Sequence, residues 1–239
     1  MSTIILACQT IRNEVRKAIE ETGVPYPVFY LEAGLHNKPE RLHARVMEEI
    51  AMLDNVGTIL MAFGFCGNSM LGLRADQAKI VIPKTEDCIP LLLGSSAARL
   101  ALSREMGTYF LTKGWLDYEQ NIIWEYERCL KRYGEQRAVR VMKTMLGHYK
   151  RFLLIDTGAY PVDSILPRTL AFAERMAMKH EIRRGSLQIL HKLFLGQWDE
   201  NFLVLKPGEE LTLDQVLGSL GDSQAVSQIS CSQNRMGER

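Results

Sequence analysis

Three cysteines and one histidine in the first 90 residues each follow an apolar run that is typical of a β-strand. These four residues are Cys8, His36, Cys66 and Cys88. In an open α/β sheet, the loops after the carboxyl ends of parallel strands gather along one edge, where ligands bind. Thiolate and imidazole groups together suit zinc, and thiolates also hold iron–sulfur clusters. The sequence therefore predicts that the four residues share a metal site, with zinc as the first choice and an iron–sulfur cluster as the alternative.

The motif around Cys66 is the sharpest of the four. It reads Gly64-Phe65-Cys66-Gly67-Asn68, and glycines on both sides of the cysteine allow a tight turn and a close approach of the backbone. A cysteine in such a turn is positioned to act as a metal ligand or as a nucleophile. A buried thiol with a purely structural role is the alternative, since free cysteine is commonly buried.

The other three candidate ligands carry weaker individual signals. Cys88 follows Asp87 and precedes an apolar helical stretch, so we expect it at a helix N-terminus, where the pKa of a thiol is lowered. Packing beneath that helix is the alternative. Cys8 taken alone favours a structural role, and His36 lies in a loop as either a ligand or an exposed side chain. Because the spacing lacks the paired cysteines of common zinc motifs, thiol chemistry without a metal stays open.

Two further features are candidates for ligand contacts. Gly185 and Ser186 follow two arginines and open a predicted helix, where free N–H groups suit the phosphate or carboxylate of a cofactor. A basic turn capped by the serine is the alternative. Trp115 is predicted either to wall a pocket or to join the core, where large aromatic side chains are more often found.

The composition is that of an ordinary globular protein. Of the 239 residues, 46% are hydrophobic and 24% are charged, and the formal net charge of +1 provides no field that would attract nucleic acid or an anionic membrane. No apolar run approaches the length of a membrane span. The start of the sequence lacks the features of a signal peptide, so we expect a cytoplasmic protein whose five cysteines stay reduced.

The order of the predicted elements gives the fold class. Apolar strands alternate with amphipathic helices over the first half, which predicts an α/β fold with a doubly wound, mainly parallel sheet. Residues 116–149 show helical spacing without a strand signal, so we expect a helical hairpin inserted there. The α/β pattern then resumes. We expect a single α/β domain over residues 1–220 and a disordered tail over residues 221–239, where apolar content is low.

Short motifs occur along most of the chain in a specific order. They are Ala7-Cys8, Leu35-His36, Gly64-Phe65-Cys66-Gly67-Asn68, Asp87-Cys88-Ile89, Gly107-Thr108-Tyr109-Phe110-Leu111-Thr112-Lys113-Gly114-Trp115, Gly185-Ser186-Leu187 and Gly196-Gln197-Trp198-Asp199. This set resembles a prokaryotic family catalogued as a domain of unknown function. That family is met alongside corrinoid-dependent methyltransferase systems, so the resemblance implies one-carbon metabolism, with a corrinoid protein or a methyltransferase subunit as partner.

These observations lead to an enzyme hypothesis and a competing one. The enzyme would be a metal-dependent methyl- or alkyltransferase, in which the metal lowers the pKa of a substrate thiol and presents a thiolate nucleophile. Such an enzyme needs an exchangeable coordination position, so one of the four predicted ligands has to dissociate from the metal or lie out of reach of it. The competing hypothesis is a non-catalytic protein that binds a metal, a corrinoid or a one-carbon carrier for a methyltransferase. A purely structural metal site is the third interpretation.

Overall fold

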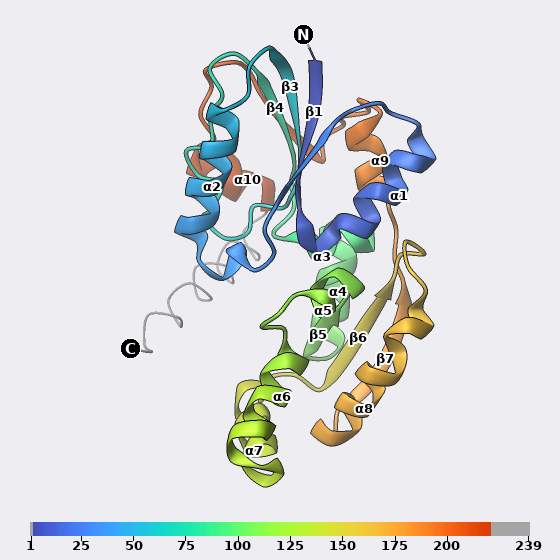
Figure 1. Cartoon of the computed structure of the whole chain (residues 1–239). Coiled ribbons are helices and arrows are strands. Elements are labelled where there is room, and N and C mark those ends of the chain that lie inside the picture. The colour runs from blue at the N-terminus through green and yellow to red at the C-terminus, as the bar shows by residue number, and fades with distance from the viewer. Residues whose placement is uncertain (1, 221–239) are drawn as a thin grey trace.

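The computed structural model describes residues 2–220, so the predicted tail lies outside the described residues. Two sheets form two lobes that lie one above the other in Figure 1. We call them the first lobe, which holds the five-stranded sheet, and the second lobe, which holds the three-stranded sheet. The chain builds most of the first lobe, crosses to the second, and returns to complete the first.

The first lobe contains a five-stranded sheet in the order β2-β1-β3-β4-β8. Strands β2, β1, β3 and β4 are parallel, and β8 joins the edge of β4 in the antiparallel direction. Figure 1 shows α2 and α10 on one face of the sheet and α1 and α9 on the other. The bounds are β1 (Ser2–Cys8), α1 (Arg12–Thr22), β2 (Val28–Leu31), α2 (Pro39–Ala51), β3 (Val56–Ala62), β4 (Lys79–Pro83), α9 (Gln188–Phe194), β8 (Phe202–Leu205) and α10 (Leu213–Leu220).

The second lobe contains a three-stranded parallel sheet in the order β5-β6-β7. Helices α6 and α7 form an antiparallel pair at its far end, and α8 lies beside β7 (Figure 1). The bounds are β5 (Thr108–Leu111), α6 (Ile122–Tyr133), α7 (Glu135–Met145), β6 (Arg151–Asp156), α8 (Leu166–Met176) and β7 (Lys179–Arg184).

Short helices fill the region between the lobes. Figure 1 shows α3, α4 and α5 at this level of the molecule. Their bounds are α3 (Cys88–Leu93), α4 (Ser96–Glu105) and α5 (Lys113–Asp117), and the short 3-10 helices are η1 (Gln9–Ile11), η2 (Leu35–Asn37) and η3 (Val162–Ser164).

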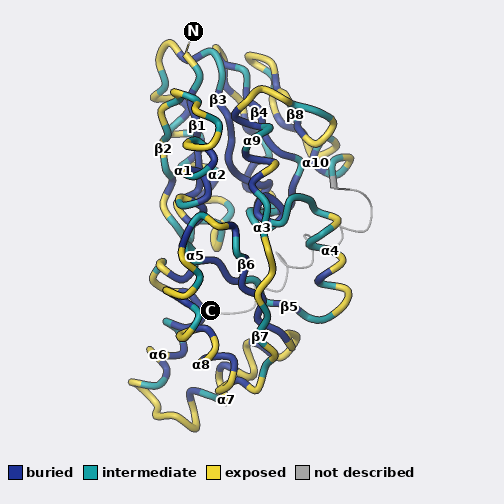
Figure 2. Tube along the Cα trace, turned by 90° about the vertical axis from the view of Figure 1, so that its right-hand side faces the viewer, coloured by how far each residue is buried: buried dark blue, intermediate teal, exposed yellow. Residues whose placement is uncertain are grey.

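The strands form where the sequence is continuously apolar. In β1 the residues from Ile4 to Cys8 are all buried, and most of β3 and β4 is buried as well (Figure 2). Helices cover both faces of this sheet, so its central strands have no polar face to expose. The buried residues divide into a large cluster around the first sheet and a smaller one centred on Phe152 and Phe172. Each lobe therefore has its own hydrophobic core.

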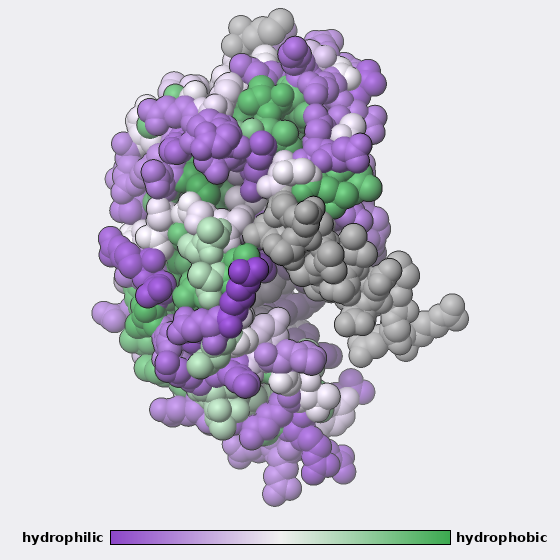
Figure 3. Space-filling view, turned by 180° about the vertical axis from the view of Figure 1, so that it is seen from behind, coloured by the Kyte–Doolittle hydropathy of each residue, from purple (hydrophilic) through white to green (hydrophobic). Residues whose placement is uncertain are grey.

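The predicted α/β fold with mainly parallel sheets is confirmed, but the single expected sheet is divided in two. The fifth predicted strand pairs with β6 in the second lobe because α3 and α4 carry the chain away from β4. The predicted hairpin is present as α6 and α7, and α5 precedes it. No helix within residues 2–220 is long and apolar enough to cross a membrane. Figure 3 shows the opposite side of the molecule from Figure 1, with a mostly hydrophilic surface interrupted by separate apolar patches.

Candidate functional site in the cleft between the two lobes

A cleft of about 990 Å³ lies between the two lobes. The first lobe contributes the carboxyl end of β1, the loops after β2 and β3, and the start of α3. The second lobe contributes β5, α5 and the residue two positions before β6. Side chains central to the chemistry of this cleft are Cys8, His36, Cys66, Cys88, Tyr109 and Trp115. All four predicted metal ligands therefore line one cleft.

The three cysteines converge because each follows one of three neighbouring parallel strands. Cys8 is the last residue of β1, Cys66 lies in the turn after β3, and Cys88 is the first residue of α3, after β4. The order β1-β3-β4 places the three turns side by side at the carboxyl edge of the sheet. The sequence pattern predicts this convergence from the strand ends alone.

The turn that holds Cys66 is strained and tightly packed. Cys66 has a φ of +49°, a left-handed conformation that is uncommon for a residue with a side chain. Its amide N–H donates to the carbonyl oxygen of Glu86 at 2.8 Å, which joins this turn to the segment before Cys88. A Cβ on Gly64 would lie 2.5 Å from the carbonyl oxygen of Asp87, so only glycine allows this approach. Backbone strain of this kind persists where the surrounding structure holds it, and it is concentrated at functional sites.

The thiols of the three cysteines interact directly. The Cys88 thiol lies beside the thiols of Cys66 and Cys8, and its interaction with each of them changes its pKa. The pKa of Cys8 is raised well above its usual value by its interaction with Cys88 and by burial. The pKa of Cys88 is also raised, first by its interaction with Cys66 and then by burial. The sequence-based expectation of a lowered pKa for Cys88 is therefore wrong, because the Cys66 thiol and burial outweigh the lowering effects of the Cys8 thiol and the helix N-terminus.

A hydroxyl and a carboxylate complete the surroundings of the thiols. The Sγ of Cys8 lies 2.9 Å from the Oγ1 of Thr10, a contact that partly offsets the rise in the pKa of Cys8. Asp87 caps α3 by accepting from the amide of Ile89 at 2.8 Å, and it also pairs with Arg99 at 3.2 Å. The negative charge of Asp87 contributes to the raised pKa of Cys88. Arg99 lines the same cleft, and no sequence motif marks it.

Across residues 2–220, no group of three or more His, Cys, Asp and Glu side chains has the spacing of a ready metal site. The Cys88 thiol thus interacts with the other two, but the three do not form a coordination shell. Cys8, Cys66 and Cys88 are the residues that would hold a cation here, and ligation would require their thiols to lose their protons.

His36 reaches the cleft from η2 and packs against the second lobe. The centroid of its ring lies 4.8 Å from that of Trp115, with an interplanar angle of 37°. Trp115 thus lines the cleft, which is the first of its two predicted positions, a pocket wall or the core. The structure brings His36 into the cleft with the cysteines and holds its ring against an aromatic partner.

Two tyrosines of the cleft are not among the predicted site residues, although Tyr109 belongs to one of the ordered motifs. The rings of Tyr109 and Tyr149 pack edge to face with centroids 5.1 Å apart. Burial raises the pKa of Tyr109 to about 12, although the side chain of Trp115 opposes part of that rise. Tyr109 belongs to β5 and Tyr149 precedes β6, so only the placement of the second lobe brings them to the cleft.

Gly185 and Ser186 serve as a link between the lobes. The Gly185 amide donates to the carbonyl oxygen of Asp156 at 2.7 Å, and the Ser186 amide donates to that of Leu92 at 2.8 Å. A Cβ on Gly185 would lie 2.6 Å from the same Leu92 oxygen. Both amides are thus occupied by backbone carbonyls, and neither residue is among those that line the cleft. Cofactor binding at these two residues stays a prediction.

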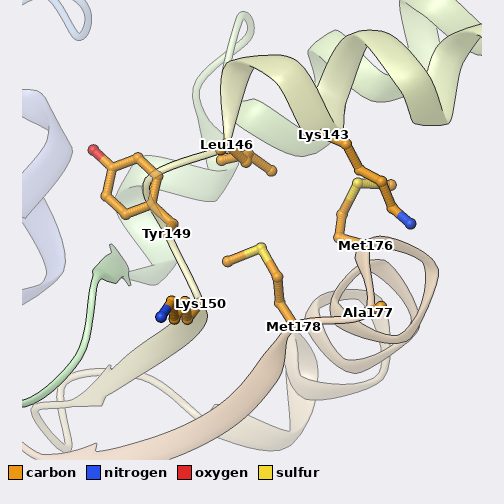
Figure 4. Close-up of a pocket in the computed structure, with 8 residues that line it drawn as sticks. Lys143, Leu146, Tyr149, Lys150, Met176, Ala177 and Met178 are labelled. Atoms are coloured by element: carbon orange, nitrogen blue, oxygen red, sulfur yellow. The ribbon is translucent and has the colours of Figure 1, made fainter.

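A smaller pocket of about 380 Å³ lies on the second lobe, where α7 and α8 approach the start of β6 (Figure 4). Leu146 and Met178 point into it, with Lys143 and Met176 to one side. Its lining combines aliphatic side chains with two lysines and carries no thiol. The larger cleft is therefore the candidate site.

Comparison with known proteins identifies the family of the chain. No curated protein and no solved structure matches it. Residues 30–194 match a family described as "Protein of unknown function (DUF1638)". The matched region contains His36, Cys66, Cys88 and the aromatic residues of the cleft, whereas Cys8 precedes it. Because the match covers more than half of the sequence, the chain belongs to the DUF1638 family of proteins of unknown function.

Proposed function

We propose that this protein is a metal-dependent enzyme that transfers a methyl or alkyl group to or from a thiol in the cleft between its lobes. The single observation that carries the proposal is the cluster of three interacting thiols at the carboxyl edge of the first sheet. Cys8, Cys66 and Cys88 are the proposed ligands, with zinc as the first choice and an iron–sulfur cluster as the alternative. One-carbon chemistry with a corrinoid partner is part of the same proposal.

Metal binding would require the three thiols to rearrange into a coordination shell. Their protonated state is favoured by burial and by their mutual interactions, and a metal would displace these protons. Cys66 and Cys88 are partly exposed to the cleft, so a metal and a substrate can both reach them. Three cysteine ligands leave one position open, which is the pattern of catalytic rather than structural zinc sites.

His36 is the fourth predicted ligand, and we assign it a position beside the metal instead of on it. Its ring packs on Trp115, which orients the imidazole along the wall of the cleft. A histidine there can accept the proton of a substrate thiol as that thiol binds. The sulfur–carbon bond then forms as the bond between carbon and leaving group breaks, and the leaving group keeps the electron pair.

The first test is the metal content of protein purified without oxygen. We expect about one metal ion or one cluster per chain in the wild type, and a loss of most of it in Cys66→Ser and Cys88→Ser. Cys129→Ser is the matched control, because Cys129 is a buried cysteine of the second core. Equal metal content in wild type and Cys66→Ser would reject the shared site.

The second test separates the enzyme from a non-catalytic carrier. The carrier is favoured by the incomplete coordination shell, which suits transient metal holding. If the metal-loaded protein transfers a methyl group from a methylcorrinoid to a small thiol, the enzyme is supported. If no transfer occurs while the protein binds a methyltransferase subunit, the carrier replaces it.

A further inference from the structure

The second-lobe wall of the cleft is built from aromatic rings. Trp115, Tyr109 and Tyr149 come from this lobe, and His36 joins them from the first. His36 packs on Trp115 with centroids 4.8 Å apart, the side chain of Trp115 lies beside that of Tyr109, and Tyr109 packs on Tyr149 at 5.1 Å. The four rings thus form a connected set, which we call the aromatic wall.

The aromatic wall is anchored from behind. The Tyr109 ring packs against Phe152 at 5.7 Å, and Phe152 packs against Phe172 at 5.2 Å in the core of the second lobe. The wall residues themselves remain partly exposed, whereas Phe152 and Phe172 are buried. Rings held in this way lose little freedom when a ligand stacks on them, because their positions are already fixed. They therefore form a preorganised surface for another flat group.

Tyr109 adds a hydrogen-bond donor to the wall. Its side chain lies beside that of Trp115 in the lining of the cleft. The indole N–H of Trp115 can only donate, so it cannot accept the phenolic proton. That proton is left for another acceptor. A ligand that stacks on the wall can supply that acceptor.

Size and charge narrow the ligand further. A volume of about 990 Å³ is at the upper end of the range for sites that bind small molecules. The charged side chains around the cleft have both signs, with Glu32, Glu40, Glu86 and Asp87 against Lys38 and Arg99, an acidic balance that disfavours an anionic ligand. The lining therefore selects by shape and stacking more than by net charge.

We propose that the ligand of this cleft is a planar heteroaromatic small molecule that stacks on the aromatic wall and accepts a hydrogen bond from Tyr109. The reaction of this ligand rests on the proposed function, because the bound ring would lie across the cleft from the three thiols. Binding itself does not depend on a metal, because none of the four wall residues is one of the cysteines.

The test is calorimetric titration of reduced, chelator-treated protein with two lactams. Quinolin-2-one is flat, and octahydroquinolin-2-one has the same carbonyl acceptor on a saturated, puckered ring system. We expect the flat lactam to bind about tenfold more tightly. We expect Tyr109→Phe to weaken its binding about fivefold, since only the hydroxyl is removed. Trp115→Leu is expected to weaken it about tenfold.

Matched variants outside the cleft serve as controls. Tyr133→Phe and Trp124→Leu lie on α6 and should leave the affinity for quinolin-2-one unchanged. Equal binding of the two lactams, no binding of either, or an unchanged affinity in Tyr109→Phe would overturn the proposal. Its failure is distinct from that of the proposed function, because the metal content of Cys66→Ser reports on the thiols alone.

Discussion

Cys66 combines a left-handed backbone with a side chain that lies beside the thiol of Cys88. At most positions a protein with alanine has a higher free energy of unfolding than one with glycine, because glycine loses more conformational freedom on folding. At φ +49° the order should reverse, since alanine keeps the steric cost of the left-handed region. The strain thus marks a position where the thiol is retained at a cost in stability.

We predict that Cys66→Gly is more stable than Cys66→Ala by about 1 kcal/mol in the metal-free protein. Urea denaturation followed by circular dichroism measures the difference. The comparison of Cys88→Gly with Cys88→Ala is the control, and there alanine should be the more stable residue because Cys88 begins α3. A more stable Cys66→Ala would show that the turn carries no such strain.

Glu14 is a second residue whose environment has a measurable consequence. It is fully buried on α1, and the hydroxyl of Thr157 donates to its Oε1 at 3.2 Å. Its Oε2 is buried without a hydrogen-bond partner within the described chain. Burial raises the pKa of this carboxyl to about 7. The folded protein therefore holds the proton that the unfolded chain releases near pH 4.5.

Stability should accordingly fall as the pH rises from about 4.5 to about 7, because the unfolded state binds fewer protons in that window. The loss attributable to Glu14 is about 3 kcal/mol for a shift of this size. Glu14→Gln removes the titration, so the stability difference between variant and wild type should increase from pH 5 to pH 8. Urea denaturation at both pH values measures it, and a constant difference would contradict the assignment.

At the scale of elements, Arg151 fixes the strands of the second sheet to one another. This first residue of β6 is almost fully buried, and its guanidinium donates to Glu181 of β7 at 2.7 Å. It also donates to the Thr108 hydroxyl of β5 and to the Leu102 carbonyl of α4. One buried side chain thus connects all three strands with the helix that leads into them.

Replacing Arg151 by methionine should lower the free energy of unfolding by about 3 kcal/mol, because buried acceptors lose their donor. Arg175→Met is the matched control, since Arg175 pairs with Glu135 in an exposed position. That change should cost less than about 1 kcal/mol. Chemical denaturation of both variants is the measurement, and equal costs would refute a special role for Arg151.

The success of sequence-based prediction also differs between elements. The strand ends that position Cys8, Cys66 and Cys88 follow from local apolar runs, so their convergence could be predicted. The pairing of β5 with β6 could not, because hydrophobic periodicity describes one strand and says nothing of its neighbour. Tyr109 and Tyr149 were missed for the same reason, since their place in the site depends on how the second lobe sits against the first.

At the scale of the whole molecule, close backbone contacts hold the lobes together. Gly114 in α5 lies against η1, and a Cβ there would be 2.1 Å from the carbonyl oxygen of Thr10. Because Thr10 also contacts the thiol of Cys8, this approach joins the second lobe directly to the candidate site. The width of the cleft therefore depends on a position that only glycine can occupy.

Gly114→Ala is expected to reduce stability by about 2 kcal/mol, as overpacking at a rigid contact does. It should also weaken the binding of quinolin-2-one, because the aromatic wall moves with α5. Gly218→Ala is the control, since a Cβ at that helical position meets nothing within 4 Å. Unchanged stability and affinity in Gly114→Ala would mean that the lobes separate freely.

The placement of β8 has a consequence for synthesis on the ribosome. This strand closes the edge of β4, yet the entire second lobe lies between the two in the sequence. The ribosome synthesises the N-terminal part first, so β4 has an unpaired edge until β8 is made about 120 residues later. The second lobe is meanwhile complete and can fold as a unit. The nascent chain therefore forms its aromatic wall before β8 completes the sheet that carries the cysteines. A chain truncated before β8 should expose the unpaired edge of β4 and be prone to aggregation.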